Sequence, residues 1–163
     1  IIISRSLIMK TKITLAFLAL FMLAGCNTTK KTTQMAGMVH QCEETSLIKD
    51  FEKHAGNAVW FAFDSSSLSP KAKEELERQA CWLSKHPEVK VTVEGHCDER
   101  GTREYNLALG ERRAAAAKQF LANKGIAHNR LNTISYGKDK PAMIGNTEEA
   151  FSYNRRAVIV LHK

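Results

Sequence analysis

Residues 91–114 read VTVEGHCDERGTREYNLALGERRA, and the change of pattern within this stretch decides the fold. Val91 and Val93 alternate with polar residues, a period of two that is typical of a strand with one buried face. Gly95 is predicted to end this strand, and a polar turn follows it. Apolar or small residues then recur at intervals of three and four, as they do in a helix: Leu107, Gly110, Ala114, Ala117 and Leu121.

This strand–turn–helix unit brings polar side chains of three kinds toward one place. Asp98 lies in the turn where the strand ends, and Asn106 and Arg113 lie with Leu109 on a second stripe of the helix. A carboxylate and a guanidinium held near each other suit a ligand that carries both an ammonium and a carboxylate. The unit therefore predicts a binding site for such a ligand.

The rest of the chain supplies the other elements of one domain. An aromatic run at residues 59–63 favours a buried first strand, and Ser69-Pro70 is a typical start of a helix that ends before Pro87. Residues 131–136 and 157–161 are predicted strands, with a short helix near residues 148–152 between them. The inward face of the first helix is predicted to be Ala72, Leu76, Ala80 and Leu83.

The resulting element order, βαβαβ(α)β, predicts an α/β (α+β) sandwich. Such an order gives a mixed four-stranded sheet with the helices packed on one face.

The central stretch also resembles the OmpA-like peptidoglycan-binding domain family, and within it the lipid-anchored members of the Tol system. The resemblance is carried by residues 95–102 (GHCDERGT), 105–106 (YN) and 109–114 (LGERRA), and it is extended by residues 135–141 and 154–158. It covers roughly residues 59–161, so it is more specific than a short motif. It implies the same fold for residues 58–163, which we expect to be the folded domain.

The resemblance implies that the domain binds peptidoglycan without a covalent bond, through meso-diaminopimelate of the stem peptide. Asp98 would bind the ammonium of that residue and Arg113 its carboxylate. The other positions implied to line the pocket are Asp64, Thr102, Asn106 and Leu109. It also implies TolB and other Tol proteins as partners, and a role in envelope integrity and cell division; a wall anchor that is not dedicated to Tol is the alternative.

Each of these residues also has a structural explanation. Asp98 is suited to capping the turn, Arg113 to a solvated surface position beside Arg112, and Asn106 to a local bond with the main chain. His96 and Cys97 are of metal-ligating types, but adjacent residues of a strand point to opposite faces. No nucleophile or oxyanion arrangement accompanies them, so we expect neither a metal or cofactor nor an enzyme.

The N-terminal region predicts export and a lipid anchor. Met9 is the first residue of a short basic segment, and we interpret residues 1–8 as the result of a misplaced start site. Residues 1–25 as a whole are predicted to be a signal peptide, since their apolar run is too short to span a bilayer. Residues 23–26 (LAGC) resemble the bacterial lipobox, which implies lipidation of Cys26. Asn27 favours the outer membrane, with the domain facing the periplasm. Residues 26–57 are predicted to form a tether with a short helix.

Charge and cysteine content narrow the function further. The net charge of +7 falls to +4 once Arg5, Lys10 and Lys12 leave with the signal peptide, and the remaining basic residues are interleaved with acidic ones, which argues against nucleic acid. Cys97 is expected to be buried and inert. Cys42 and Cys81 are the pair for which we predict a disulfide in an oxidising compartment.

Overall fold

The computed structural model describes residues 45–162. Residues 1–44 and residue 163 are outside the described part of the chain. The predicted signal peptide, the lipidated Cys26, the tether and Cys42 therefore lie outside the described residues and stay predictions. Within residues 45–162, no helix has the length and apolar character needed to cross a bilayer.

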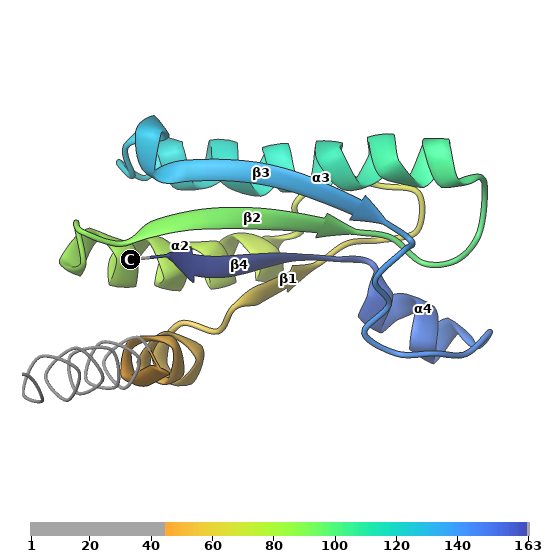
Figure 1. Ribbon diagram of the computed structural model, residues 1–163, viewed down its shortest axis with the longest axis horizontal. Coiled ribbons are helices and arrows are strands. Elements are labelled where there is room, and N and C mark those ends of the chain that lie inside the picture. The colour runs from red at the N-terminus through yellow and green to blue at the C-terminus, as the bar shows by residue number, and fades with distance from the viewer. Residues whose placement is uncertain (1–44, 163) are drawn as a thin grey trace, which may run out of the picture. The chain divides into compact units, whose positions relative to one another are not determined.

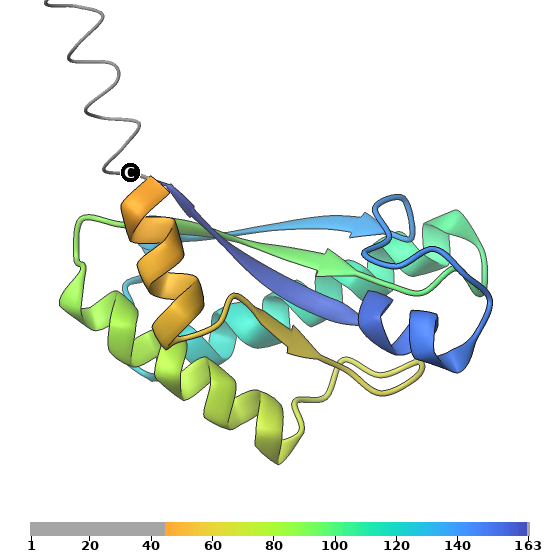
Figure 2. The same ribbon diagram turned by 90° about the horizontal axis from the view of Figure 1, so that it is seen from below.

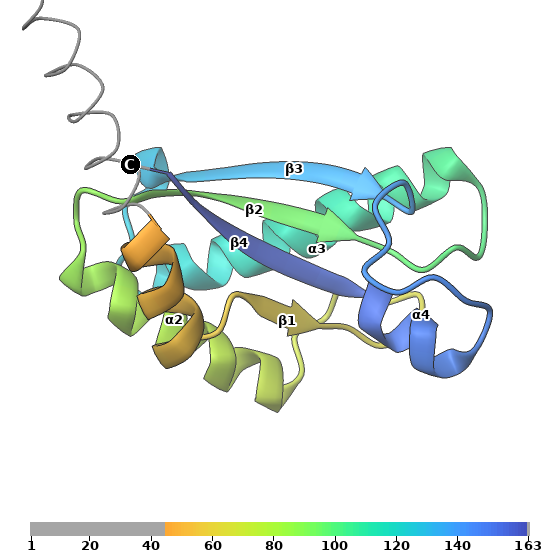
Figure 3. The same cartoon turned by 60° about the horizontal axis from the view of Figure 1, so that its bottom comes forward.

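The centre of the fold is a four-stranded mixed sheet in the order β1-β4-β2-β3 (Figure 3). The strands are β1 (Ala58–Trp60), β2 (Lys90–His96), β3 (Leu131–Gly137) and β4 (Arg156–His162). Strands β2 and β3 are parallel, whereas β4 runs antiparallel to both of its neighbours. The predicted mixed four-stranded sheet is confirmed.

The two long helices, α2 (Pro70–Lys85) and α3 (Arg103–Asn123), lie on the same side of the sheet (Figures 1 and 2). Helix α3 connects the parallel strands β2 and β3, followed by the short 3₁₀ helix η1 (His128–Arg130). Helix α4 (Glu148–Asn154) lies beyond the end of the sheet, where β4 begins. The predicted α/β sandwich is therefore confirmed.

The helix ends follow from their sequences. Ser69 Oγ accepts the main-chain N–H of Ala72 at 3.1 Å, and Pro70 takes the first helical position of α2, as predicted. Thr102 caps α3 in the same way, and Gly125, with φ of +95°, follows its last turn. The predicted inward residues of α2 are all buried, and two more lie with them: Gln79 and Trp82.

A further helix at residues 45–54 packs into the same core. Phe51 and Ala55 are buried against the hydrophobic cluster, whereas Ile48 is exposed. Part of the segment before residue 58 therefore packs on the domain, and the domain boundary expected at residue 58 stays a prediction.

Gly95 does not end its strand, which corrects the expectation from the sequence. Strand β2 continues to His96, and a Cβ atom at Gly95 would lie 1.9 Å from the carbonyl oxygen of Gly110 in α3. Glycine is needed at this position because the backbones of β2 and α3 approach each other there. Of the apolar stripe predicted on α3, Gly110, Ala114, Ala117 and Leu121 are buried and only Leu107 is exposed. The second stripe, with Asn106, Leu109 and Arg113, is buried as well.

The first strand is shorter than predicted, since it covers residues 58–60 instead of 59–63. Phe61 is buried, but Trp60 and Phe63 are largely exposed. Beyond Trp60 the main-chain carbonyls of residues 61, 62 and 65 accept hydrogen bonds from two arginine side chains. The N–H of Phe61 still donates to the main-chain carbonyl of Arg155 at 2.9 Å, and beyond it these arginine side chains hold the loop.

Gly95→Ala is expected to destabilise the domain by about 1–3 kcal/mol or more, because the added methyl group meets a main-chain oxygen that cannot rotate away. The free energy of unfolding from urea denaturation measures the change. Lys90→Ala, at an exposed position of the same strand, is the control and should stay within about 0.5 kcal/mol of the wild type. Equal stability of the two variants would contradict the close approach of β2 and α3.

Candidate binding site

A pocket of about 160 Å³ lies at the carboxyl end of β2, between the loop after β1 and the first turns of α3. Five of the six pocket residues predicted from the sequence line it, and Thr102 does not. The complete lining is Phe63, Asp64, Cys97, Asp98, Arg100, Gly101, Tyr105, Asn106, Leu109 and Arg113.

Asp98 is buried, with 4% of its surface exposed, and its carboxylate is held by two arginines. The Arg100 side chain donates from Nη2 at 2.6 Å and from Nε at 3.2 Å, and Arg155 Nη1 lies at 3.3 Å. Burial acts to raise the pKa of Asp98, but these hydrogen bonds outweigh it and keep the pKa below its usual value. Asp98 Oδ1 also accepts the main-chain N–H of Arg100, so the expected turn cap is present as well.

Arg113 is also buried, with 1% of its surface exposed, so its explanation as a solvated surface residue is wrong. Its Nε, Nη1 and Nη2 donate to the main-chain carbonyls of Ser65, His96 and Ala62 at 2.8, 2.9 and 3.1 Å. A guanidinium has five N–H donors, which leaves at most two for a ligand. Burial lowers the pKa of Arg113, opposed by Cys97 and Asp98 nearby.

The other predicted residues take supporting positions. Asn106 Nδ2 donates to the carbonyls of Arg100 and Thr102, at 2.8 and 3.0 Å, so the local bond expected as its alternative explanation is present. Thr102 accepts the N–H of Tyr105 as the N-cap of α3. Leu109 forms an apolar part of the wall.

Asp64 lies at the exposed rim of the pocket. Its φ of +52° places it in the left-handed region, which aspartate tolerates better than most residues. Its carboxylate accepts a hydrogen bond from the Tyr105 hydroxyl.

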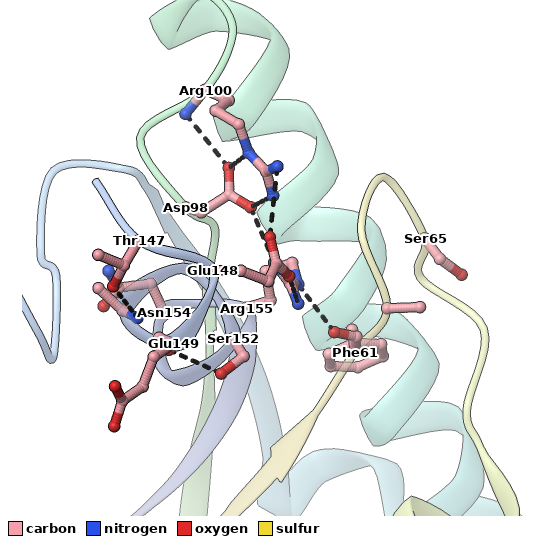
Figure 4. Close-up of polar contacts among 12 residues, drawn as sticks. Phe61, Ser65, Asp98, Arg100, Thr147, Glu148, Glu149, Ser152, Asn154 and Arg155 are labelled. Atoms are coloured by element: carbon pink, nitrogen blue, oxygen red, sulfur yellow. Dashed lines mark hydrogen bonds and ion pairs between the residues drawn. The ribbon is translucent and has the colours of Figure 1, made fainter. Parts of the chain in front are cut away.

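Arg100, Glu148 and Arg155 belong to the site but were not assigned a site role from the sequence. Figure 4 shows them around Asp98, with Glu148 between the two arginines. Glu148 Oε1 lies 2.7 Å from Arg155 Nη2, and its Oε2 lies 3.5 Å from Arg100 Nη1. Arg100 follows Asp98 by two residues, so its contact with Asp98 could have been predicted from the sequence. Arg155 is 57 residues away from Asp98, and only the fold brings the two close.

His96 and Cys97 do not form a metal site with Asp98. The His96 ring lies beside Glu94 and Tyr136, whereas Cys97 lines the pocket. Within residues 45–162, no group of three metal-ligating side chains exists. The burial predicted for Cys97 is confirmed, with 3% of its surface exposed, and burial raises the pKa of its thiol.

Cys81 is exposed and forms no disulfide within the described part of the chain. Its proposed partner Cys42 lies outside that part, so their pairing stays a prediction.

The domain is expected to lose stability in acid through His96. Burial first, and the positive charge of Arg156 second, lower the pKa of His96 to about 4. Between pH 6.5 and 4 the unfolded chain then binds a proton at this residue that the folded chain does not, so stability falls as the pH falls through this window, by up to about 3 kcal/mol. Urea denaturation at pH 7 and pH 4 measures the loss.

His96→Gln should remove most of this pH dependence, while His128→Gln, at an exposed position, should keep it. Asp98, with its lowered pKa, adds its own loss only at lower pH. A His96→Gln chain that loses as much stability as the wild type would show that His96 does not carry the effect.

Comparison with known proteins gives a consistent set of relatives. The model of the OmpA family matches residues 60–155. A peptidoglycan-associated lipoprotein of Brucella melitensis is 44% identical over 151 residues, which cover 89% of this chain and 90% of the relative. One of the same name from Agrobacterium fabrum is 48% identical over 143 residues, or 85% of this chain and 81% of the relative.

Solved structures agree with these matches. The crystal structure of the peptidoglycan-associated lipoprotein from Burkholderia pseudomallei superimposes with a TM-score of 0.63 at 39% identity, covering 65% of this chain and 90% of that one. The C-terminal domain of Helicobacter pylori MotB gives a TM-score of 0.62 at 24% identity, covers 66% of this chain and 84% of that one, and supports the fold alone. The family and the three lipoproteins are not named as enzymes, in agreement with the prediction of a binding protein.

Proposed function

Because this chain belongs to the OmpA family, we propose that it is a lipoprotein whose folded domain binds peptidoglycan non-covalently and so anchors the outer membrane to the wall. One observation supports this most directly: a buried carboxylate, Asp98, and a buried guanidinium, Arg113, line the same pocket. Arg113 donates to main-chain carbonyls rather than to Asp98, so the two charges are not cancelled by a bond between them.

The ligand group proposed is meso-diaminopimelate, whose free end carries an ammonium beside a carboxylate. The carboxylate of Asp98 accepts hydrogen bonds from the ammonium group of the ligand. The remaining N–H donors of Arg113 bind the carboxylate group of the ligand. Leu109 lies against the aliphatic part of the ligand, Asp64 takes a polar contact at the rim, and Asn106 holds the turn that carries Asp98. Thr102 contributes by capping α3, which keeps the loop before the helix in place.

The anchor has two ends in this proposal. Cys26 carries the acyl chains in the outer membrane, since two or more chains hold a protein stably whereas one does not. The domain holds the wall from the periplasmic side, and many modest contacts add up along the envelope. The Tol system, with TolB as the direct partner, and a role in cell division follow from the family alone.

Binding to purified sacculi tests the site. The chain from residue 27 onward should pellet with sacculi, whereas Asp98→Asn and Arg113→Lys should lose about 2 kcal/mol or more of binding free energy, roughly 30-fold in affinity. Arg113→Lys keeps the charge but loses the planar fork that binds main-chain carbonyls and a carboxylate together. Circular dichroism checks that both variants are folded.

Asp139→Asn and Arg112→Lys are the matched controls, because they make the same two substitutions at exposed positions outside the pocket, and both should pellet like the wild type. Release of soluble wall fragments would point to a hydrolase instead. A folded wild-type chain that stays in solution would contradict wall binding and direct the search to protein partners.

A further inference from the structure

The carboxylate of Asp98, which the proposed function assigns to a ligand ammonium, has no free acceptor position in the structure. Oδ1 accepts the main-chain N–H and the Nε–H of Arg100, both at 3.2 Å. Oδ2 accepts Arg100 Nη2 at 2.6 Å and Arg155 Nη1 at 3.3 Å. A carboxylate offers about four lone-pair positions, and all four have a donor here. An incoming ammonium must therefore replace one of these donors.

Arg155 is poorly suited to leave. Only 7% of its surface is exposed, and its Nε donates to the carbonyl of Phe61 at 3.1 Å. Its Nη2 is paired with Glu148 Oε1 at 2.7 Å (Figure 4). Removing this guanidinium from Asp98 would break three buried or partly buried contacts from different parts of the chain.

Arg100 is suited to leave. Its side chain is 35% exposed, and its guanidinium lies between the rings of Phe63 and Phe151, 4.0 and 4.3 Å from their centres. Its second terminal nitrogen, Nη1, already lies 3.5 Å from Glu148 Oε2, and the Glu148 side chain is 65% exposed. The guanidinium can thus leave Asp98 and keep both a carboxylate partner and an aromatic surface.

We propose that Arg100 is an internal occupant of the ammonium site, that a wall peptide displaces its guanidinium from Asp98, and that Glu148 holds it once displaced. The proposal rests on the proposed function, because it names how that same site is opened. When the Arg100 side chain leaves, Arg155 and the main-chain N–H of Arg100 still donate to Asp98, so the buried carboxylate keeps partners until the ammonium binds. The free site is closed in this way, and ligand binding selects the open arrangement.

The exchange makes the ammonium group of the ligand a condition for binding. A ligand that offers only a carboxylate or only sugar hydroxyls brings no cation to replace Arg100, so it meets a closed site. The fraction of molecules with Arg100 displaced also sets the apparent affinity, since the measured Kd is the intrinsic Kd divided by that fraction.

The sign of one substitution distinguishes an occupant from a ligand contact. Calorimetry with a disaccharide tetrapeptide that carries free meso-diaminopimelate is run on the chain from residue 27 onward. Arg100→Gln should bind about tenfold more tightly than the wild type, as expected if roughly a tenth of the molecules are open. Arg103→Gln, which removes an exposed arginine paired with Asp139 instead, is the matched control and should leave Kd unchanged.

A peptide acetylated on the diaminopimelate amine is the second ligand, and Arg100→Gln should not improve its binding. Weaker binding of the free peptide to Arg100→Gln, with wild-type binding intact, would overturn the displacement and leave the proposed function standing. If the Arg100→Gln chain binds the free peptide and the wild-type chain does not, the result would support a wild-type site that is closed in nearly all molecules. Binding by neither chain would overturn both the displacement and the assignment of Asp98 to an ammonium.

Glu148→Gln tests where the displaced arginine goes. It should weaken binding in the wild-type chain, because displaced Arg100 loses its carboxylate partner, and it should change nothing in the Arg100→Gln chain. An equal loss in both chains would show that Glu148 acts through Arg155 and would overturn its role as the receiver.

A measurement on the wild-type side chain keeps the proposal testable even if Arg100→Gln folds poorly. In arginine Nε–H NMR spectra, addition of the free peptide should shift the Arg100 signal as its bond to Asp98 breaks. The Arg103 signal should stay in place. An unshifted Arg100 signal at saturating peptide would overturn the displacement.

Discussion

The arrangement of the site depends on the hydrogen bonds that Arg113 makes to three main-chain carbonyls. Two of these carbonyls belong to the loop after β1 and the third ends β2, so one side chain of α3 fixes both edges of the pocket. A buried guanidinium needs hydrogen-bond acceptors, and the main-chain carbonyls of the loop and of β2 supply three of them here.

The same side chain can reach these carbonyls only because α3 lies very close to the sheet. Gly95 and Gly110 permit this approach, since a Cβ on either would meet atoms of the facing element at 1.9 or 2.3 Å. The polar stripe with Asn106 and Arg113 faces inward at the pocket end, while Leu107 is exposed.

The charged side chains around Asp98 form a network in which carboxylates and guanidinium groups alternate. Asp98 is shared by Arg100 and Arg155, and Glu148 is close to both arginines. Such a network can exchange one cation for another without leaving a buried charge unpaired, whereas loss of a single member is costly. Recognition by exchange is therefore compatible with a site that stays stable when it is empty.

The sequence by itself determined the elements whose signals are local: the cap Ser69, the period of β2, the inward face of α2 and the run of residues that places Asp98 before α3. It also identified five residues of the pocket, because they recur at helical spacing or follow a family pattern. It misread Gly95 as a strand end and Leu107 as core, because only the packing of α3 on β2 gives that glycine its purpose and that leucine its exposure. The sequence assigned no role to Arg155 or Glu148. Both lie about 50 residues or more from Asp98 along the chain, and only the tertiary structure brings them together.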